Sequence, residues 1–139
     1  MAVFLIYIVL AAALGRFFPL GTSSWPHLER LGDGLSVLGA LFILTAFGRF
    51  SRAGTSVEVG RSAAALVTDG PYALSRNPIY LGLMLVAVGR MIGNLWVFLL
   101  LVPTLFALQR MVIEKEEAHL ESRFGEEYRR YKASVRRWL

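Results

Sequence analysis

Long apolar runs alternate with polar segments along the whole chain. Runs almost free of charge cover residues 2–18, 34–50, 79–92 and 95–112, and hydrophobic residues make up 55% of the 139 positions. A hydrocarbon core of about 30 Å is spanned by about 20 helical residues, so such runs are typical of membrane-spanning helices. The pattern predicts an all-α, polytopic membrane protein with about four transmembrane helices in a single domain over residues 1–139.

The third and fourth runs are separated by only Gly93 and Asn94, which predicts a helical hairpin. Gly89 lies close to this connection and is interpreted as a turn residue. A helix over 79–92 reaches only about 21 Å, which is shorter than the hydrocarbon thickness. Either this helix begins below the membrane interface, or the hairpin crosses a thinned part of the bilayer.

The first two runs are joined by a segment rich in turn formers. Prolines and glycines are frequent between residues 19 and 33, and they predict a loop. In the second run, Ser36, Gly39 and Ala40 are small enough to let another helix approach closely. No lysine or arginine precedes the apolar stretch of the first run, which favours a retained helix over a cleaved signal peptide.

The C-terminal segment has the periodicity of an amphipathic helix. Its apolar residues recur at spacings of three and four, which places them on one face. Gly125 falls inside this segment and is expected to divide the helix into two pieces. The apolar stripe consists of Leu120, Phe124, Tyr128, Tyr131, Val135 and Trp138.

Basic residues are distributed unevenly between the two sides that four spans create. Of the 15 lysines and arginines, twelve lie in residues 49–78 or 110–139, and three lie on the opposite side. Because basic loops stay on the cytoplasmic side, we expect both termini and both polar segments to be cytoplasmic. The expected location is the lipid bilayer of a prokaryotic inner membrane.

Composition excludes several kinds of site. The chain has no cysteine, so disulfides and zinc–thiolate centres are ruled out. His27 and His119 lack the spacing of a metal site, and no metal is expected. The net charge of +5 favours an anionic bilayer surface over nucleic acid as the partner. No glycine-rich nucleotide motif follows a strand, so a cofactor has to lie between the helices and their cytoplasmic ends.

The first polar segment, 68–80, ends where the third apolar run begins. Asn77 and Pro78 have the order of an N-cap followed by the first helical residue. A helix N-terminus offers free amide hydrogens and positive potential to an anionic group. Tyr72 and Tyr80 flank this point with flat, polar-tipped rings. The residues alone fit a ligand site and a plain, interface-anchored helix start equally well.

The second polar segment follows the last apolar run. Glu114, Glu116 and Glu117 lie there beside Arg110. A carboxylate at this position can hold a cationic or hydroxyl-bearing ligand. The alternative, which physics alone favours, is that the acidic residues only solvate a helix as it leaves the lipid.

Two ordered motifs resemble the integral-membrane methyltransferases, a superfamily that includes isoprenylcysteine carboxyl methyltransferase and the phospholipid N-methyltransferases. The first motif is Val-Thr-Asp-Gly-Pro-Tyr at 67–72, continued by Ser-Arg-Asn-Pro-Ile-Tyr-Leu-Gly at 75–82. The second is Glu-Glu at 116–117, followed by Phe-Gly-Glu-Glu-Tyr at 124–128. The resemblance covers residues 65–139.

The resemblance implies S-adenosyl-L-methionine as the cofactor, bound by segments 64–80 and 110–131. It further implies methylation of a lipid or another membrane-embedded acceptor, with Arg76 and Arg110 as substrate-binding residues. The cofactor-binding residues carried over from the motifs are Ala64, Leu66, Val67, Tyr72, Asn77, Pro78, Ile79, Tyr80 and Glu116.

Three positions depart from the family pattern. Ala64 stands where relatives usually have histidine, and Asn77 stands where many have it. Val112 aligns with an arginine that binds the substrate carboxylate in the isoprenylcysteine enzymes, while Arg110 lies one helical step away. The last departure weakens the isoprenylcysteine assignment in particular.

The implied chemistry is compatible with these residues. Methyl transfer from a sulfonium is an in-line displacement that depends on positioning and on exclusion of water. Aromatic rings at Tyr72 and Tyr80 favour a cation by about 0.5–2 kcal/mol. A carboxylate acceptor needs no general base, whereas an amine acceptor does, and Glu116 and Glu117 are the catalytic candidates.

Two other interpretations stay open from the sequence. Membrane sterol reductases share a related C-terminal signature and use NADPH, although they carry a longer set of spans. A non-enzymatic lipid-binding or scaffold protein is the second alternative. The residues also leave open the identity of the methyl acceptor and the oligomeric state.

Overall fold

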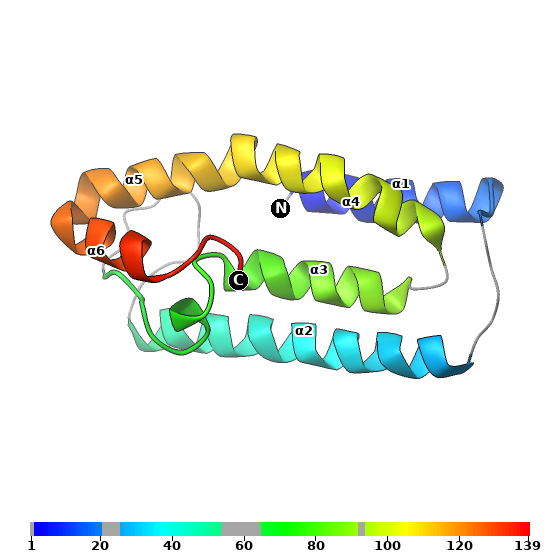
Figure 1. Cartoon of the computed structure of the whole chain (residues 1–139), viewed down its shortest axis with the longest axis horizontal. Helices are drawn as coiled ribbons and strands as arrows, with labels where there is room; N and C mark the ends of the chain where they lie inside the picture. The colour runs from blue at the N-terminus through cyan, green and yellow to red at the C-terminus, as the bar shows by residue number, and fades with distance from the viewer. Residues whose placement is uncertain (1, 21–25, 54–64, 92–93) are drawn as a thin grey trace.

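The computed structural model describes residues 2–20, 26–53, 65–91 and 94–139, and every regular element in these ranges is helical (Figure 1). The all-α prediction is therefore confirmed for this part of the chain. The four longer apolar helices are α1 (Ala2–Phe17), α2 (Pro26–Arg52), α3 (Pro78–Arg90) and α4 (Leu95–Leu108). The shorter elements are the 3₁₀ turn η1 (Gly70–Ala73), the π-helical turn η2 (Gln109–Ile113), α5 (Glu114–Phe124) and α6 (Glu126–Ser134).

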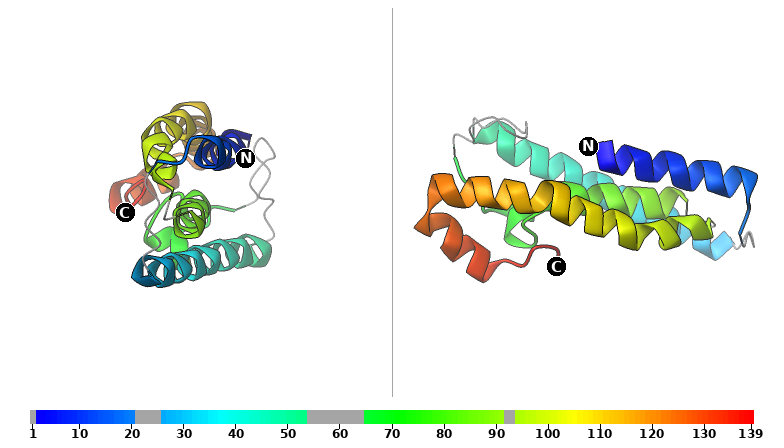
Figure 2. Two further views of the ribbon diagram at one scale, coloured as in Figure 1. Left: turned by 90° about the vertical axis from the view of Figure 1, so that its right-hand side faces the viewer. Right: turned by 90° about the horizontal axis from the view of Figure 1, so that it is seen from above.

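The apolar helices pack as two pairs. Helix α2 contacts α3, and α1 contacts α4, so that the pairs lie in two layers (Figures 1 and 2). The core between the layers takes buried side chains from α1, α3 and α4, including Phe4, Met84 and Val97. At one end of the bundle, η1, α5 and α6 gather near the end of α2 (Figure 1). Both polar segments therefore lie at the same end of the molecule.

Within the described ranges, two helices are long and apolar enough to cross a membrane by length and composition. The first is His27–Arg52. The second is Leu95–Phe124, a continuous helix that consists of α4, η2 and α5. Helices α1 and α3 are apolar but shorter. Many large apolar side chains on the helix surfaces are exposed, for example Leu44, Val102 and Phe106. Outward-facing apolar side chains are what a lipid environment requires.

The loop predicted over 19–33 is wrong for its second part, because α2 already begins at Pro26. Proline is well tolerated at the first helical position, where its missing N–H costs nothing. Gly32 lies within α2, next to α3. Its carbonyl oxygen would lie 2.3 Å from a Cβ atom added at Gly89.

Glycines set the distance between α2 and α3. A Cβ atom at Gly82 would lie 2.7 Å from the carbonyl oxygen of Gly39, and one at Gly39 would lie 2.5 Å from that of Gly82. Such close backbone approach is possible only without side chains. The contact predicted for Gly39 is confirmed. The interpretation of Gly89 as a turn residue is wrong, because it is buried within α3 against α2.

Polar side chains fix α1 against α4. The Tyr7 hydroxyl donates a hydrogen bond to the Val97 carbonyl oxygen at 3.0 Å. Asn94 caps α4 through its side-chain oxygen, which accepts from the Trp96 N–H at 3.1 Å, and its side-chain nitrogen donates to Ala11 O at 2.8 Å. One residue thus starts α4 and holds α1 in place.

The glycine contact leads to a matched pair of variants. Both Gly39→Ala and Gly48→Ala replace a glycine within α2 and gain about 1 kcal/mol of helix propensity. At Gly48 an added Cβ meets open space, whereas at Gly39 it meets the backbone and side chain of α3. We expect Gly39→Ala to lower the thermal unfolding midpoint in detergent, because overpacking costs about 1–3 kcal/mol. Gly48→Ala should leave the midpoint unchanged or raise it; equal shifts in both would contradict the contact.

Candidate functional site

The two polar segments meet at Tyr80 and Glu116. Tyr80 lies in the first turn of α3 and Glu116 in the first turn of α5. The Tyr80 hydroxyl donates a hydrogen bond to Glu116 Oε1 at 3.4 Å. Tyr80 is buried and Glu116 is half-buried. The structure thus brings together two expected site residues that are 36 positions apart in the chain.

Glu116 has an unusual environment for a carboxyl group. Burial raises its pKa above the ordinary value of 4.5, and the hydrogen bond from Tyr80 only partly opposes this effect. A long hydrogen bond to one hydroxyl leaves most of the acceptor capacity of a carboxylate unused. Glu116 is therefore a half-buried carboxyl group whose oxygens can accept from a further donor.

Tyr72 lies close to the same point. It is buried in η1, its carbonyl oxygen accepts a hydrogen bond from the Tyr131 hydroxyl at 2.7 Å, and its ring meets that of Phe50 edge-on at 5.2 Å. Burial, followed by the nearby Tyr131, Glu116 and Tyr80, raises the pKa of Tyr72. Three hydroxyl or carboxyl groups of the expected site therefore share one electrostatic environment.

Asn77 and Pro78 start α3 as predicted, but not through a side-chain cap. The Asn77 side chain makes no capping bond, and its Nδ2 instead donates to the carbonyl oxygen of Arg137 at 3.1 Å. The Asn77 N–H donates to Ser75 Oγ at 3.2 Å, and Ser75 is fully buried. The Asn77 side chain therefore bonds the C-terminal segment and does not cap α3. Ser75 carried no signal in the sequence that set it apart from an ordinary turn residue.

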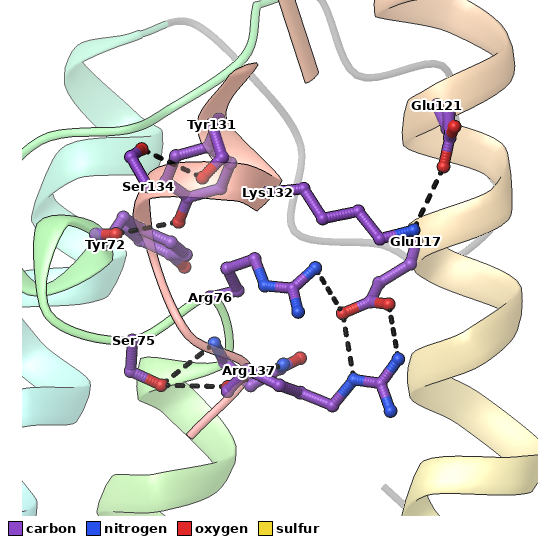
Figure 3. Close-up of polar contacts among 10 residues, drawn as sticks. Tyr72, Ser75, Arg76, Glu117, Glu121, Tyr131, Lys132, Ser134 and Arg137 are labelled. Atoms are coloured by element: carbon purple, nitrogen blue, oxygen red, sulfur yellow. Dashed lines mark hydrogen bonds and ion pairs between the residues drawn. The ribbon is translucent and has the colours of Figure 1, made fainter. Parts of the chain in front are cut away.

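Glu117 lies in an ion cluster (Figure 3). Its two oxygens accept from Arg137 Nε at 3.1 Å and Nη2 at 2.7 Å, and its side chain is only 8% exposed. Arg76 Nη1 lies 3.0 Å from Glu117 Oε1, as an ion pair without hydrogen-bond alignment. Removing one member of such a buried pair is strongly destabilising. Sequence reasoning missed Arg137, because nothing in its spacing pointed to a partner 20 residues away.

Leu66, Val67 and Ile79 pack against an aromatic cluster at the same end of the bundle. Its buried members are Ala46, Tyr72, Tyr128 and Tyr131. An open surface hollow of about 300 Å³ lies beside it. It is lined by Arg49, Arg52, Ala53, Leu66, Val67, Thr68 and Asp69.

One expected site residue, Arg110, does not join this group by its contacts. Arg110 is exposed, pairs with Glu114 at 3.5 Å and lies over the Phe106 ring at 5.5 Å. Ala64 lies outside the described residues. Within the part of the chain that the structure covers, no group of three or more His, Asp or Glu residues is placed to hold a metal ion.

Comparisons with known proteins support the same assignment as the motifs. The model of the phospholipid methyltransferase family matches residues 28–127, which include both polar segments almost completely. An uncharacterized protein of Haemophilus influenzae is 41% identical over 63 residues, which are 44% of this chain and all of the relative. No solved structure matches the chain.

A protein-S-isoprenylcysteine O-methyltransferase of Schizosaccharomyces pombe is similar over a longer stretch. It is 34% identical over 113 residues, which are 72% of this chain and 46% of the yeast protein. The chain therefore spans about half the length of this relative. The family model covers most of the present chain and contains the Tyr80–Glu116 contact. The chain belongs to the phospholipid methyltransferase family, within the superfamily of membrane methyltransferases.

Proposed function

We propose that the protein transfers a methyl group from S-adenosyl-L-methionine to a lipid or another membrane-embedded acceptor. The contact between Tyr80 and Glu116 carries this proposal, because it joins the two family motifs at one end of an apolar helix bundle. Membership of the family supports methyl transfer as the reaction. The relative in yeast, named for a lipidated cysteine substrate, supports an acceptor that resides in the membrane.

The residues at this point fit a cationic ligand. A half-buried carboxylate at Glu116 and the aromatic rings of Tyr72 and Tyr80 all favour positive charge, the rings by about 0.5–2 kcal/mol each. When bound there, the cofactor would supply an electrophilic methyl group on a sulfonium, which an electron pair of the acceptor would take in exchange for the sulfur–carbon bond. The protein's share is to orient both partners and to exclude water.

The two adjacent glutamates suit different tasks. Both oxygens of Glu117 are held by guanidinium groups, so its carboxylate is blocked from a substrate. Glu116 keeps free acceptor capacity, and burial raises its pKa. If the acceptor is an amine, Glu116 is therefore the residue to take its proton. A carboxylate acceptor needs no base.

We further propose that the site faces the cytoplasm, with both termini on that side. The excess of lysine and arginine in the segments at the site end supports this orientation. The apolar helix faces let a lipid substrate approach from the bilayer, while the soluble cofactor reaches the polar end of the bundle (Figure 1).

Binding of S-adenosylhomocysteine tests the site directly. We expect Tyr80→Phe and Glu116→Gln each to weaken binding about tenfold, the effect of losing one hydrogen bond to a charged group. Titration calorimetry of the detergent-solubilised protein measures the affinity. Glu114→Gln is the matched control, because Glu114 lies on the same helix but pairs with exposed Arg110. Unchanged affinity in both site variants would contradict the proposal.

The pH dependence of this affinity has a defined sign. Only the ionised Glu116 attracts a cation, which in S-adenosylhomocysteine is the α-ammonium group, and burial raises the pKa of Glu116. Affinity should be constant at pH values above that raised pKa, and below it should fall to about the level of Glu116→Gln, about tenfold in total. Calorimetric titrations between pH 8 and pH 5 follow the change. Glu116→Gln should remove the acidic fall, and an identical profile in both proteins would exclude Glu116 as the group responsible.

The acceptor is identified by transfer of label. We expect the purified protein, incubated with methyl-labelled cofactor and a lipid extract of its host, to label the lipid fraction. Mild base then separates the two acceptor classes, because it releases label from a methyl ester and leaves an N-methyl group intact. The Glu116→Gln protein is the control. Label confined to water-soluble products would contradict a membrane-embedded acceptor.

A further inference from the structure

Residues 135–138, here called the strap, follow α6 and return across the start of α3 (Figure 3). The carbonyl oxygen of Arg137 accepts hydrogen bonds from Ser75 Oγ at 3.2 Å and from Asn77 Nδ2 at 3.1 Å. Ser75 and Asn77 are both buried. The strap thus satisfies two buried polar side chains that directly precede α3.

A backbone hydrogen bond adds to this attachment. The Arg76 N–H donates to the carbonyl oxygen of Arg136 at 3.0 Å. Together with the bonds to Arg137, it fastens the strap to three consecutive residues, 75–77. Tyr80 lies three residues after Asn77, in the first turn of α3. The position of the strap therefore bears on the position of the expected site.

The side chain of Arg137 fixes the strap to the other motif. Its guanidinium makes two parallel hydrogen bonds to Glu117, the neighbour of Glu116 on α5. A bidentate arginine–carboxylate pair of this kind is geometrically specific and stronger than a neutral hydrogen bond. Arg137 therefore bonds the strap to both halves of the expected site, to Asn77 before α3 and to Glu117 on α5.

Apolar contacts hold the two ends of the strap. Val135 packs against the cluster that contains Tyr72 and Tyr131, and Trp138 packs against the core that contains Tyr80. The strap therefore lies between the two hydrophobic clusters. The family match ends at residue 127, so these contacts belong to a part of the chain that the match does not cover.

We propose that the strap is a latch, closed by Arg137 on Glu117, that positions the start of α3 and retains the ligand bound beside Glu116. The ligand part rests on the proposed function. Arg137 acts as a positioning residue, because its bonds reach Ser75, Asn77 and Glu117 and not Tyr80 or Glu116. Glu117 serves as its buried anchor.

The test compares two neighbouring arginines in the full-length protein. We expect Arg137→Gln to speed hydrogen exchange at the Arg76 amide about tenfold, because the strap that accepts its hydrogen bond loses a charge-assisted anchor. Affinity for S-adenosylhomocysteine should fall by a similar factor, mainly through faster dissociation. Arg136→Gln is the matched control, since that side chain is exposed, and it should change neither quantity.

A second variant and a second set of amides separate the latch from general unfolding. Arg137→Lys keeps the charge but loses the paired geometry, so we expect smaller changes in the same direction. Amides of α4 report on the rest of the bundle and should stay protected in every variant. If the α4 amides lose protection in Arg137→Gln, that variant reports general unfolding. Exchange at the Arg76 amide and ligand affinity in Arg137→Lys then decide whether the latch exists.

Two results would overturn the latch. One is an Arg76 amide that stays protected in Arg137→Gln, because the strap is then not held by this pair. The other is a freely exchanging Arg76 amide with unchanged ligand affinity, because the strap then does not position the site. Failure of the wild-type protein to bind S-adenosylhomocysteine would instead refute the proposed function, and with it ligand retention, while the exchange result would still decide whether Arg137 holds the strap.

Discussion

A buried carboxylate between two guanidinium groups is the constraint on which the polar end of this protein depends. Glu117 lies where water is largely excluded, and an unpaired charge there would be costly. Arg76, from the segment before α3, and Arg137, from the strap, both approach it. Meeting this one electrostatic requirement draws three distant parts of the chain together, and it does so beside Tyr80 and Glu116.

Adjacent glutamates in a helix can have opposite properties, because neighbouring positions face different directions. Glu117 points into the ion cluster and is fully engaged there. Glu116 faces Tyr80 and keeps unused acceptor capacity, while burial raises its pKa. A perturbed, under-paired carboxylate beside a saturated one is a combination expected of functional sites, where one group supports the fold and the other meets the ligand.

The helix bundle supports this arrangement by close backbone contact. Gly39 and Gly82 allow α2 and α3 to approach without side chains between them. A pair of helices packed in this way is a firm base for the first turn of α3, where Tyr80 lies. Precision at the site is thus provided by rigid apolar helices, and recognition by the polar groups at their ends.

The sequence by itself determined the helical class, the start of α3 at Asn77-Pro78, the break at Gly125 and the two motifs, because these follow from periodicity and local backbone preference. It did not reveal that Gly89 is a packing residue, because a glycine's neighbour is set by another helix. The start of α2 at Pro26 was also missed, because proline is common both in loops and at the first helical position. Only the tertiary structure divided the roles of Glu116 and Glu117 and supplied Arg137. Burial and pairing arise when remote segments meet, and no local pattern encodes them.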